Sequence, residues 1–357
     1  MGYGVTAWRD SGLSAVRGAT VGPIESSQHP DRGYGTAASA ACLDELVALG
    51  VNWVSVTPFG RQWSLEATEI RMDFEAPYAQ NREAVTRFVA QAHARGLRVL
   101  LIPHLWLDMP GWRGEIGEKN AQGAPRAFTQ DEWTRWFRSY TRFVTEWART
   151  AERAGADMFS VGVELKSSSA TRGEWFDVID AIRRVYRGPL TYSANWDEAD
   201  KVIFWDRLDV AGIQAFYPLA EREGAPISEL RSAARRRADD LERWAVREQR
   251  PVMFAEFGYK AIVDTTLRPW EWPDGMTNVR VSGRAQAEAY RALLEAFVTR
   301  PWFVGGYVWR YYADPMDSSQ EEAWGFSPRQ RDGETVLREL YNPAIAWGAD
   351  PMQDVSW

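Results

Sequence analysis

Two glutamates at the ends of apolar segments are the residues whose placement suggests chemistry. Glu164 directly follows the run FSVGV (159–163), and Glu256 interrupts VMFAEFGY (252–259), where no charge occurs from 251 to 255. Burying a carboxylate costs several kcal/mol unless partners compensate, so a chain with no use for such a group would rarely keep it. Taken alone, Glu164 could still form a structural ion pair.

As a pair, the two carboxyl groups match the requirement of glycoside hydrolysis. One acid protonates the departing glycosidic oxygen, and one carboxylate attacks the anomeric carbon or activates a water molecule. Such a pair works only if the fold brings both groups to one cleft. We therefore ask which elements position them.

Short apolar runs alternate with helical patterns along the whole chain. The runs are continuous and rich in Val, Ile and Phe, as in parallel strands that are covered on both faces. The expected strands are 17–23, 51–59, 97–106, 157–165, 189–195, 209–218, 250–259 and 302–312. The expected helices are 36–49, 81–95, 130–154, 173–187, 228–248, 284–299 and a short one near 330–340, with 197–207 weakly helical at best.

Eight strands with intervening helices predict an α/β fold, a (β/α)8 TIM barrel. A doubly wound open sheet is the main alternative, but it usually has fewer strands and a Gly-rich first turn. No linker or low-complexity segment divides the sequence. We expect one catalytic domain over residues 1–357, with the barrel core at about 17–341.

Loop lengths indicate which end of this barrel is the working face. Helix-to-strand connections are minimal, whereas the strand-to-helix connections near 60–80, 104–129, 260–283 and 313–329 are long. In TIM barrels the elaborated C-terminal face holds the active site. Glu164 ends the fourth strand and Glu256 the seventh, so both can face one cleft across the barrel mouth.

Composition favours a carbohydrate ligand and disfavours other partners. The chain has 19 Trp, and pyranose C–H groups pack well on aromatic planes, although a Trp-rich core explains part of this number. A net charge of −7 without a basic stripe argues against nucleic acid. No segment approaches the roughly 18 apolar residues of a membrane span. We also expect no metal site and no cofactor, because the three histidines are scattered and no Cys cluster or phosphate-binding loop occurs.

Several longer motifs resemble those of glycoside hydrolase family 113, which belongs to the large clan of retaining (β/α)8 hydrolases and is known for β-1,4-mannanases. The matching stretches are YGTAASAACLDELVALGVNWVSV, VGVELKS around Glu164, FAEFGY around Glu256 and GGYVWRYY on the eighth strand. The resemblance covers about residues 17–312. It implies a retaining hydrolase of β-linked glycans.

The resemblance also implies residue roles. Glu164 resembles the acid/base and Glu256 the nucleophile. Tyr217 resembles the tyrosine that hydrogen-bonds the nucleophile, and Trp309 the tryptophan under the sugar at the cleavage point. Most of the clan has Asn before the acid/base, where it contacts the sugar 2-hydroxyl. Here that residue is Val163, so another group must recognise the hydroxyl.

Other residues at or just after strand ends are expected to contact sugar or to order the carboxylates. They are His104 and Trp106 at the third strand, Asn195 and Trp196 at the fifth, Arg61 after the second, and Lys166 two residues past Glu164. For His104 the alternative is a structural histidine, and for Lys166 a solvated loop lysine is an equal alternative.

We therefore predict a glycoside hydrolase acting on a β-linked glycan, with β-1,4-mannan favoured. Another β-glycan (a glucan or an amino-sugar polymer) and a non-catalytic carbohydrate-binding barrel are the alternatives. Oligomeric state, endo or exo action and compartment stay open. The N-terminus shows no signal peptide, and a secreted or periplasmic location would require one that has been removed.

Overall fold

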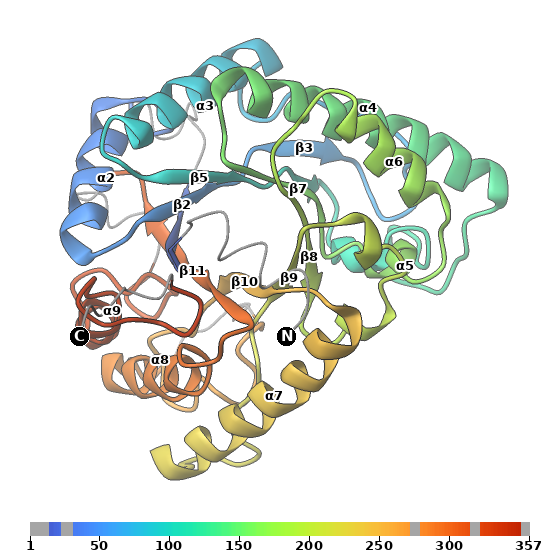
Figure 1. Ribbon diagram of the computed structural model, residues 1–357. Coiled ribbons are helices and arrows are strands. Elements are labelled where there is room, and N and C mark those ends of the chain that lie inside the picture. The colour runs from blue at the N-terminus through green and yellow to red at the C-terminus, as the bar shows by residue number, and fades with distance from the viewer. Residues whose placement is uncertain (1–13, 23–30, 272–278, 315–321, 351–357) are drawn as a thin grey trace.

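The computed structural model describes residues 14–22, 31–271, 279–314 and 322–350. Its centre is a closed barrel of eight parallel strands with helices on the outside (Figure 1). In chain order these strands are β1 (Val16–Gly22), β2 (Trp53–Val56), β5 (Arg98–Leu101), β7 (Met158–Val163), β8 (Leu190–Asn195), β9 (Val210–Gln214), β10 (Val252–Phe257) and β11 (Phe303–Tyr312). Each pairs with the next, and β11 closes the barrel against β1. The predicted (β/α)8 fold is confirmed.

The barrel strands are buried on both faces. Every residue of β1, β2, β7 and β10 is buried, because the outer helices cover one face and barrel side chains fill the other. This explains why the strands appear in the sequence as continuous apolar runs. Residues 1–13, in which no signal peptide was expected, lie outside the described part of the chain.

The outer helices agree with the predicted segments to within a few residues. They are α2 (Ala37–Leu49), α3 (Tyr78–His93), α4 (Gln130–Ala154), α6 (Glu174–Arg183), α7 (Ile227–Glu248), α8 (Gly283–Phe297) and α9 (Asp332–Leu340), with a single turn α5 (Lys166–Ser169) after β7. Capping boxes at Thr36 and Thr129 begin α2 and α4. Gly50 and Gly155 end them in the left-handed conformation, with φ of 96° and 78°. The segment 197–207 forms two short 3-10 turns, η2 (Ala199–Lys201) and η3 (Trp205–Arg207). No helix in the described part of the chain has the length and apolar character needed to cross a membrane.

Two predicted strands are each split in two. The run 51–59 forms β2 and then β3 (Phe59–Gln62), and the run 97–106 forms β5 and then β6 (His104–Leu107). Pro58 and Pro103 fall at the breaks, because proline lacks the N–H that a ladder requires. Beyond the breaks, β3 pairs with β6 and with the short β4 (Ile70–Arg71) in a second, three-stranded sheet. This sheet extends the barrel rim on the C-terminal side.

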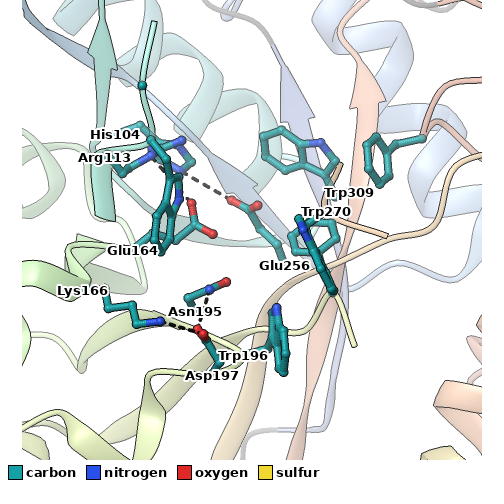
Figure 2. Close-up of a pocket in the computed structure, with 14 residues that line it drawn as sticks. His104, Arg113, Glu164, Lys166, Asn195, Trp196, Asp197, Glu256, Trp270 and Trp309 are labelled. Atoms are coloured by element: carbon teal, nitrogen blue, oxygen red, sulfur yellow. Dashed lines mark hydrogen bonds and ion pairs between the residues drawn. The ribbon is translucent and has the colours of Figure 1, made fainter. Parts of the chain in front are cut away.

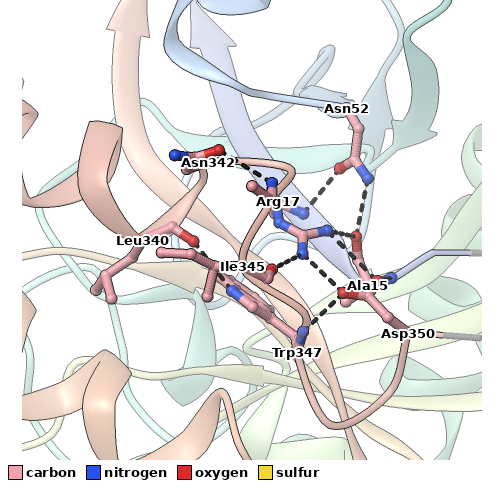
Figure 3. Close-up of polar contacts among 9 residues, drawn as sticks. Ala15, Arg17, Asn52, Leu340, Asn342, Ile345, Trp347 and Asp350 are labelled. Carbon is pink, nitrogen blue, oxygen red and sulfur yellow. Dashed lines mark hydrogen bonds and ion pairs between the residues drawn. The ribbon is translucent and has the colours of Figure 1, made fainter. Parts of the chain in front are cut away.

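A buried ion pair fixes the opposite, N-terminal end of the barrel (Figure 3). Arg17 at the start of β1 pairs with Asp350 at 2.7 Å, and their side chains are 6% and 14% exposed. Asp350 also accepts hydrogen bonds from the backbone N–H groups of Ala15 and Trp347, both at 2.7 Å. Burial by itself raises the pKa of Asp350, but these hydrogen bonds and Arg17 outweigh it and lower the pKa. The pair ties the C-terminal segment to the first barrel strand.

We expect Asp350→Ala to lower the free energy of unfolding by about 2 to 3 kcal/mol, because Arg17 would remain buried without a counter-charge. Since the folded-state pKa of Asp350 is depressed, its contribution is present above the unfolded-state pKa and is lost as pH falls through the folded-state pKa. Urea unfolding at neutral and acidic pH measures both effects. Asp180→Ala, in the exposed pair with Arg207, is the matched control and should change stability by less than about 0.5 kcal/mol. Equal losses in the two variants would contradict the argument.

Candidate active site

A cavity of about 550 Å³ opens at the C-terminal ends of the barrel strands (Figure 2). Aromatic, cationic and acidic side chains from six different strand ends and loops line it. They are His104, Trp112, Arg113, Glu164, Lys166, Asn195, Trp196, Asp197, Phe216, Glu256, Trp270, Trp309 and Phe326, together with Gly111. Both glutamates singled out in the sequence thus face one space.

Glu164 leaves the end of β7 through an unusual backbone turn. Its φ is 53°, a left-handed value that costs a non-glycine residue some strain. Two hydrogen bonds hold the turn: the Glu164 N–H donates to the carbonyl of Ser193, and the Leu165 N–H donates to the hydroxyl of Tyr192. The Glu164 carboxyl lies in the cavity, with Oε2 3.7 Å from Nε of Arg113.

Glu256 lies within β10 and is 4% exposed. Its Oε1 is 3.4 Å from Nε2 of His104. Burial raises the pKa of Glu256 to about 7, although a hydrogen bond from Gln214 and the charges of Arg113 and Arg310 oppose this rise. Strand register explains the Gln214 contact, because Gln214 at the end of β9 is the direct cross-strand partner of Glu256.

His104 is a neutral imidazole in this site. Burial, followed by the charges of Arg113 and Arg310, holds its pKa well below the usual range. Nδ1 lies 2.9 Å from a guanidinium nitrogen of Arg113, which can only donate, so Nδ1 accepts and the ring proton is on Nε2. Nε2 lies 3.4 Å from Oε1 of Glu256 without forming a hydrogen bond among the described residues.

The two carboxyl groups are placed in unequal electrostatic surroundings. Burial raises the pKa of Glu164, and the charge of Glu256 raises it further, whereas Arg113 and a hydrogen bond from Trp112 lower it. Glu256 accepts a hydrogen bond from Gln214, which lowers its pKa, and lies 3.4 Å from Nε2 of His104. Burial is thus the main cause that raises the pKa of both carboxyl groups.

Aromatic residues form the walls around the carboxyl groups. Trp196, after β8, stacks on Trp270 with ring centroids 5.4 Å apart and planes inclined by 27°. Trp309, on β11, lies parallel to the His104 ring at 6.4 Å. These flat apolar surfaces suit the faces of sugar rings.

A polar chain of contacts holds the loop after β8. Lys166 donates to Asp197 at 2.6 Å, and the side-chain amide of Asn195 donates to the same carboxylate at 2.7 Å. Lys166 is thus tied to Asp197 and not to Glu164. Both Lys166 and Asn195 lie at the cavity wall, and contact of either with sugar stays a prediction.

Glu198 is a fully buried carboxyl behind this wall that sequence reasoning did not find. It accepts hydrogen bonds from the hydroxyls of Ser169 and Tyr192 and from the backbone N–H of Asn195. Burial raises the pKa of Glu198 to about 7. Because Tyr192 also holds the backbone at Leu165, Glu198 links the loop after β8 to the turn that carries Glu164.

Three predicted site residues lie outside the cavity. Tyr217 is buried beyond the end of β9, against Trp196 and Phe254, and its hydroxyl has no hydrogen-bond partner among the described residues. Gln214, not Tyr217, adjoins Glu256. Arg61 and Trp106 lie on the second sheet, next to the cavity but not in its lining.

Arg113 and Gln214 are contacts of the carboxyl groups that the sequence did not reveal. Arg113 comes from η1 (Arg113–Glu115) inside the long loop after β6, where no periodic pattern fixes its direction. The sequence prediction extended the sixth strand to residue 218. A strand end at residue 214 would have marked Gln214 as a candidate site residue.

The fold and the site together define a class. A closed (β/α)8 barrel that holds two carboxyl groups among tryptophans at its C-terminal face is typical of glycoside hydrolases. The model of Glycoside Hydrolase Family 113 matches residues 27–325. The chain belongs to this family and is a glycoside hydrolase, which confirms the resemblance seen in the sequence motifs.

Solved structures of the family share the fold. A GH113 β-mannanase from Alicyclobacillus acidocaldarius, in complex with ManMIm, superposes with a TM-score of 0.76 at 25% identity, covering 93% of this chain and 99% of that chain. A second GH113 β-1,4-mannanase gives 0.76 at 23% identity, covering 93% and 100%. A β-glucuronidase from Ruminococcus gnavus gives 0.61 at 12% identity, covering 92% of this chain and 50% of its own, and shares the fold alone. No match was found among curated protein sequences.

Proposed function

We propose that the protein hydrolyses β-1,4-linked mannan with net retention, using Glu256 as nucleophile and Glu164 as acid/base. The observation that carries this proposal is the convergence of the β7 and β10 carboxyl groups on one tryptophan-lined cavity. The family and its mannanase structures support the choice of mannan.

In the first step, Glu256 attacks the anomeric carbon while protonated Glu164 gives its proton to the departing glycosidic oxygen. The carbon–oxygen bond to the leaving sugar breaks and an ester to Glu256 forms. This ester has no charge, so one influence that raised the pKa of Glu164 is gone. Glu164 then takes a proton from water, and the resulting attack at the anomeric carbon releases Glu256 as a carboxylate.

Val163 bears on sugar recognition. It is 2% exposed and its side chain cannot hydrogen-bond a hydroxyl. Arg113 and Asn195 are the polar groups beside Glu164 that the cavity offers instead.

Release of reducing ends from a panel of polysaccharides tests the proposal. We expect activity on mannan or glucomannan to exceed that on cellulose derivatives and chitosan. Preference for a glucan or an amino-sugar polymer would overturn the substrate. A protein that binds a glycan but cleaves none would overturn the catalytic proposal.

Arg113→Ala should shift both limbs of the pH profile of kcat/KM to higher pH. The Arg113 charge lowers the pKa of Glu256 and of Glu164. The acidic limb reports ionisation of Glu256 and the alkaline limb deprotonation of Glu164, so loss of the cation raises both. We expect a fall in kcat/KM at the optimum of roughly tenfold.

Arg113→Lys is the matched control for that shift, because it keeps the charge and loses the planar geometry. Its limbs should stay near those of the wild type. A profile for Arg113→Ala that moves to lower pH, or does not move, would contradict the electrostatic role.

A further inference from the structure

The second sheet carries a face that continues outward from the catalytic cavity. His104 and Trp106 are two residues apart on β6, so their side chains point to the same face, and strand geometry places them roughly 7 Å apart along it. On the neighbouring strand β3, Phe59 pairs with His104 and Arg61 pairs with Trp106. The face that begins beside Glu256 therefore extends past the barrel rim by about the length of one hexopyranose unit.

Trp106 is fixed in place yet open to solvent. Its ring packs edge-on against Phe59 at 6.1 Å and against Phe74 at 5.7 Å, and the residue is nevertheless 48% exposed. An immobilised apolar ring that stays exposed loses little conformational freedom on binding. This is the behaviour expected of a platform for a ligand.

Trp63, at the end of β3, provides a second exposed ring on the same side. It is 64% exposed, and its carbonyl accepts a hydrogen bond from the N–H of Met109 in the segment after β6. Between the two tryptophans, Arg61 pairs with Asp108 at 2.7 Å. Rings and charged hydrogen-bonding groups thus alternate along the face.

Two shallow hollows connect this face to the catalytic cavity. The first, of about 370 Å³, includes Trp106 and Asp108 and shares Trp112 and Arg113 with the cavity. The second, of about 290 Å³, is lined by Trp63 and Arg61 and shares Asp108 with the first. The shared lining residues place the two hollows and the cavity next to one another.

We propose that this face, formed by Arg61, Trp63, Trp106 and Asp108, binds distal sugar units of the same β-linked glycan whose cleavage occurs between Glu164 and Glu256. The proposal rests on the proposed function for the identity of the glycan. Pyranose faces pack on the two tryptophans, and hydroxyl groups hydrogen-bond Arg61 and Asp108. The site then favours long chains over short ones.

The test compares β-1,4-linked manno-oligosaccharides of three and six units in the wild type, Trp106→Ala and Trp63→Ala. We expect the ratio of kcat/KM for the six-unit to the three-unit substrate to fall about tenfold in Trp106→Ala. Trp106→Phe, which keeps a ring, should recover part of it. Val246→Ala, exposed on α7 away from the sheet, should keep the wild-type ratio. An unchanged ratio in both Trp→Ala variants, or equal losses on both lengths, would overturn the proposal.

A binding measurement separates this proposal from the proposed function. Native gels containing glucomannan, hydroxyethyl cellulose or glycol chitosan report binding through retardation, whether or not the glycan is cleaved. If the wild type cleaves none of them, the proposed function fails. In that case the distal site is still supported if a glycan retards the wild type and retards Trp106→Ala and Trp63→Ala less. The distal site is overturned if none of the three glycans retards the wild type.

Discussion

Glu256→Ala is expected to lower kcat on a β-1,4-glycan by on the order of 10⁵-fold, because the variant lacks the carboxylate that forms the glycosyl ester in the proposed mechanism. The loss should appear on activated aryl glycosides as well, since their good leaving group does not replace a nucleophile. The Glu256→Ala variant should not be less stable than the wild type, because a buried carboxyl whose pKa is raised to about 7 destabilises the fold. Thermal unfolding of the variant checks this, and Glu229→Ala on α7 serves as the surface control.

Azide identifies the face from which Glu256 acts. In Glu256→Ala, azide can enter the space of the lost carboxylate and attack a β-aryl glycoside, which gives the α-glycosyl azide and restores part of the rate. NMR of the product distinguishes the two anomers. A β-azide from this variant, or full activity without azide, would contradict the assignment of Glu256 as nucleophile.

The barrel could be predicted because its strands and helix ends are determined locally. The run VMFA (252–255) is apolar on both faces because β10 is covered on both, and Gly155 ends α4 at a position that needs a positive φ. Pro58 and Pro103 also mark in the sequence where the two strands break. The second sheet could not be predicted from them, because it depends on pairing between β3 and β6, which lie more than 40 residues apart.

The candidate site was predictable where residues end strands and unpredictable where loops decide. Glu164 and Asn195 reach the cavity from the ends of β7 and β8, and Trp309 reaches it from within β11. Tyr217 does not, because it lies three residues beyond the end of β9 and packs against Trp196 and Phe254. Arg113 depends on the path of a long loop, and no spacing in the sequence encodes that path.

Glu164 occupies a left-handed turn that no motif in the sequence indicates. Its φ of 53° is maintained by contacts to Ser193 and Tyr192 on β8, and Tyr192 in turn donates to buried Glu198. The position of the Glu164 carboxyl group, the proposed acid/base, therefore depends on a neighbouring strand and not on β7 alone. A substitution that shortens the side chain leaves these backbone contacts intact, which makes Glu164→Ala a clean test of the carboxyl group.

We expect Glu164→Ala to lower kcat/KM on polysaccharide by about 10²- to 10⁴-fold, the range of general acid catalysis. On a dinitrophenyl glycoside, whose leaving group needs no proton, formation of the glycosyl ester should be far less affected, and slow hydrolysis of the ester should produce a burst of dinitrophenol. Azide should accelerate turnover and give the β-glycosyl azide, the opposite anomer from Glu256→Ala.

The alkaline limb of the pH profile should also disappear in Glu164→Ala, because in the wild type activity is expected to fall as pH rises through the raised pKa of Glu164. Equal losses on activated and natural substrates, or an alkaline limb that persists, would show that the proton comes from another group.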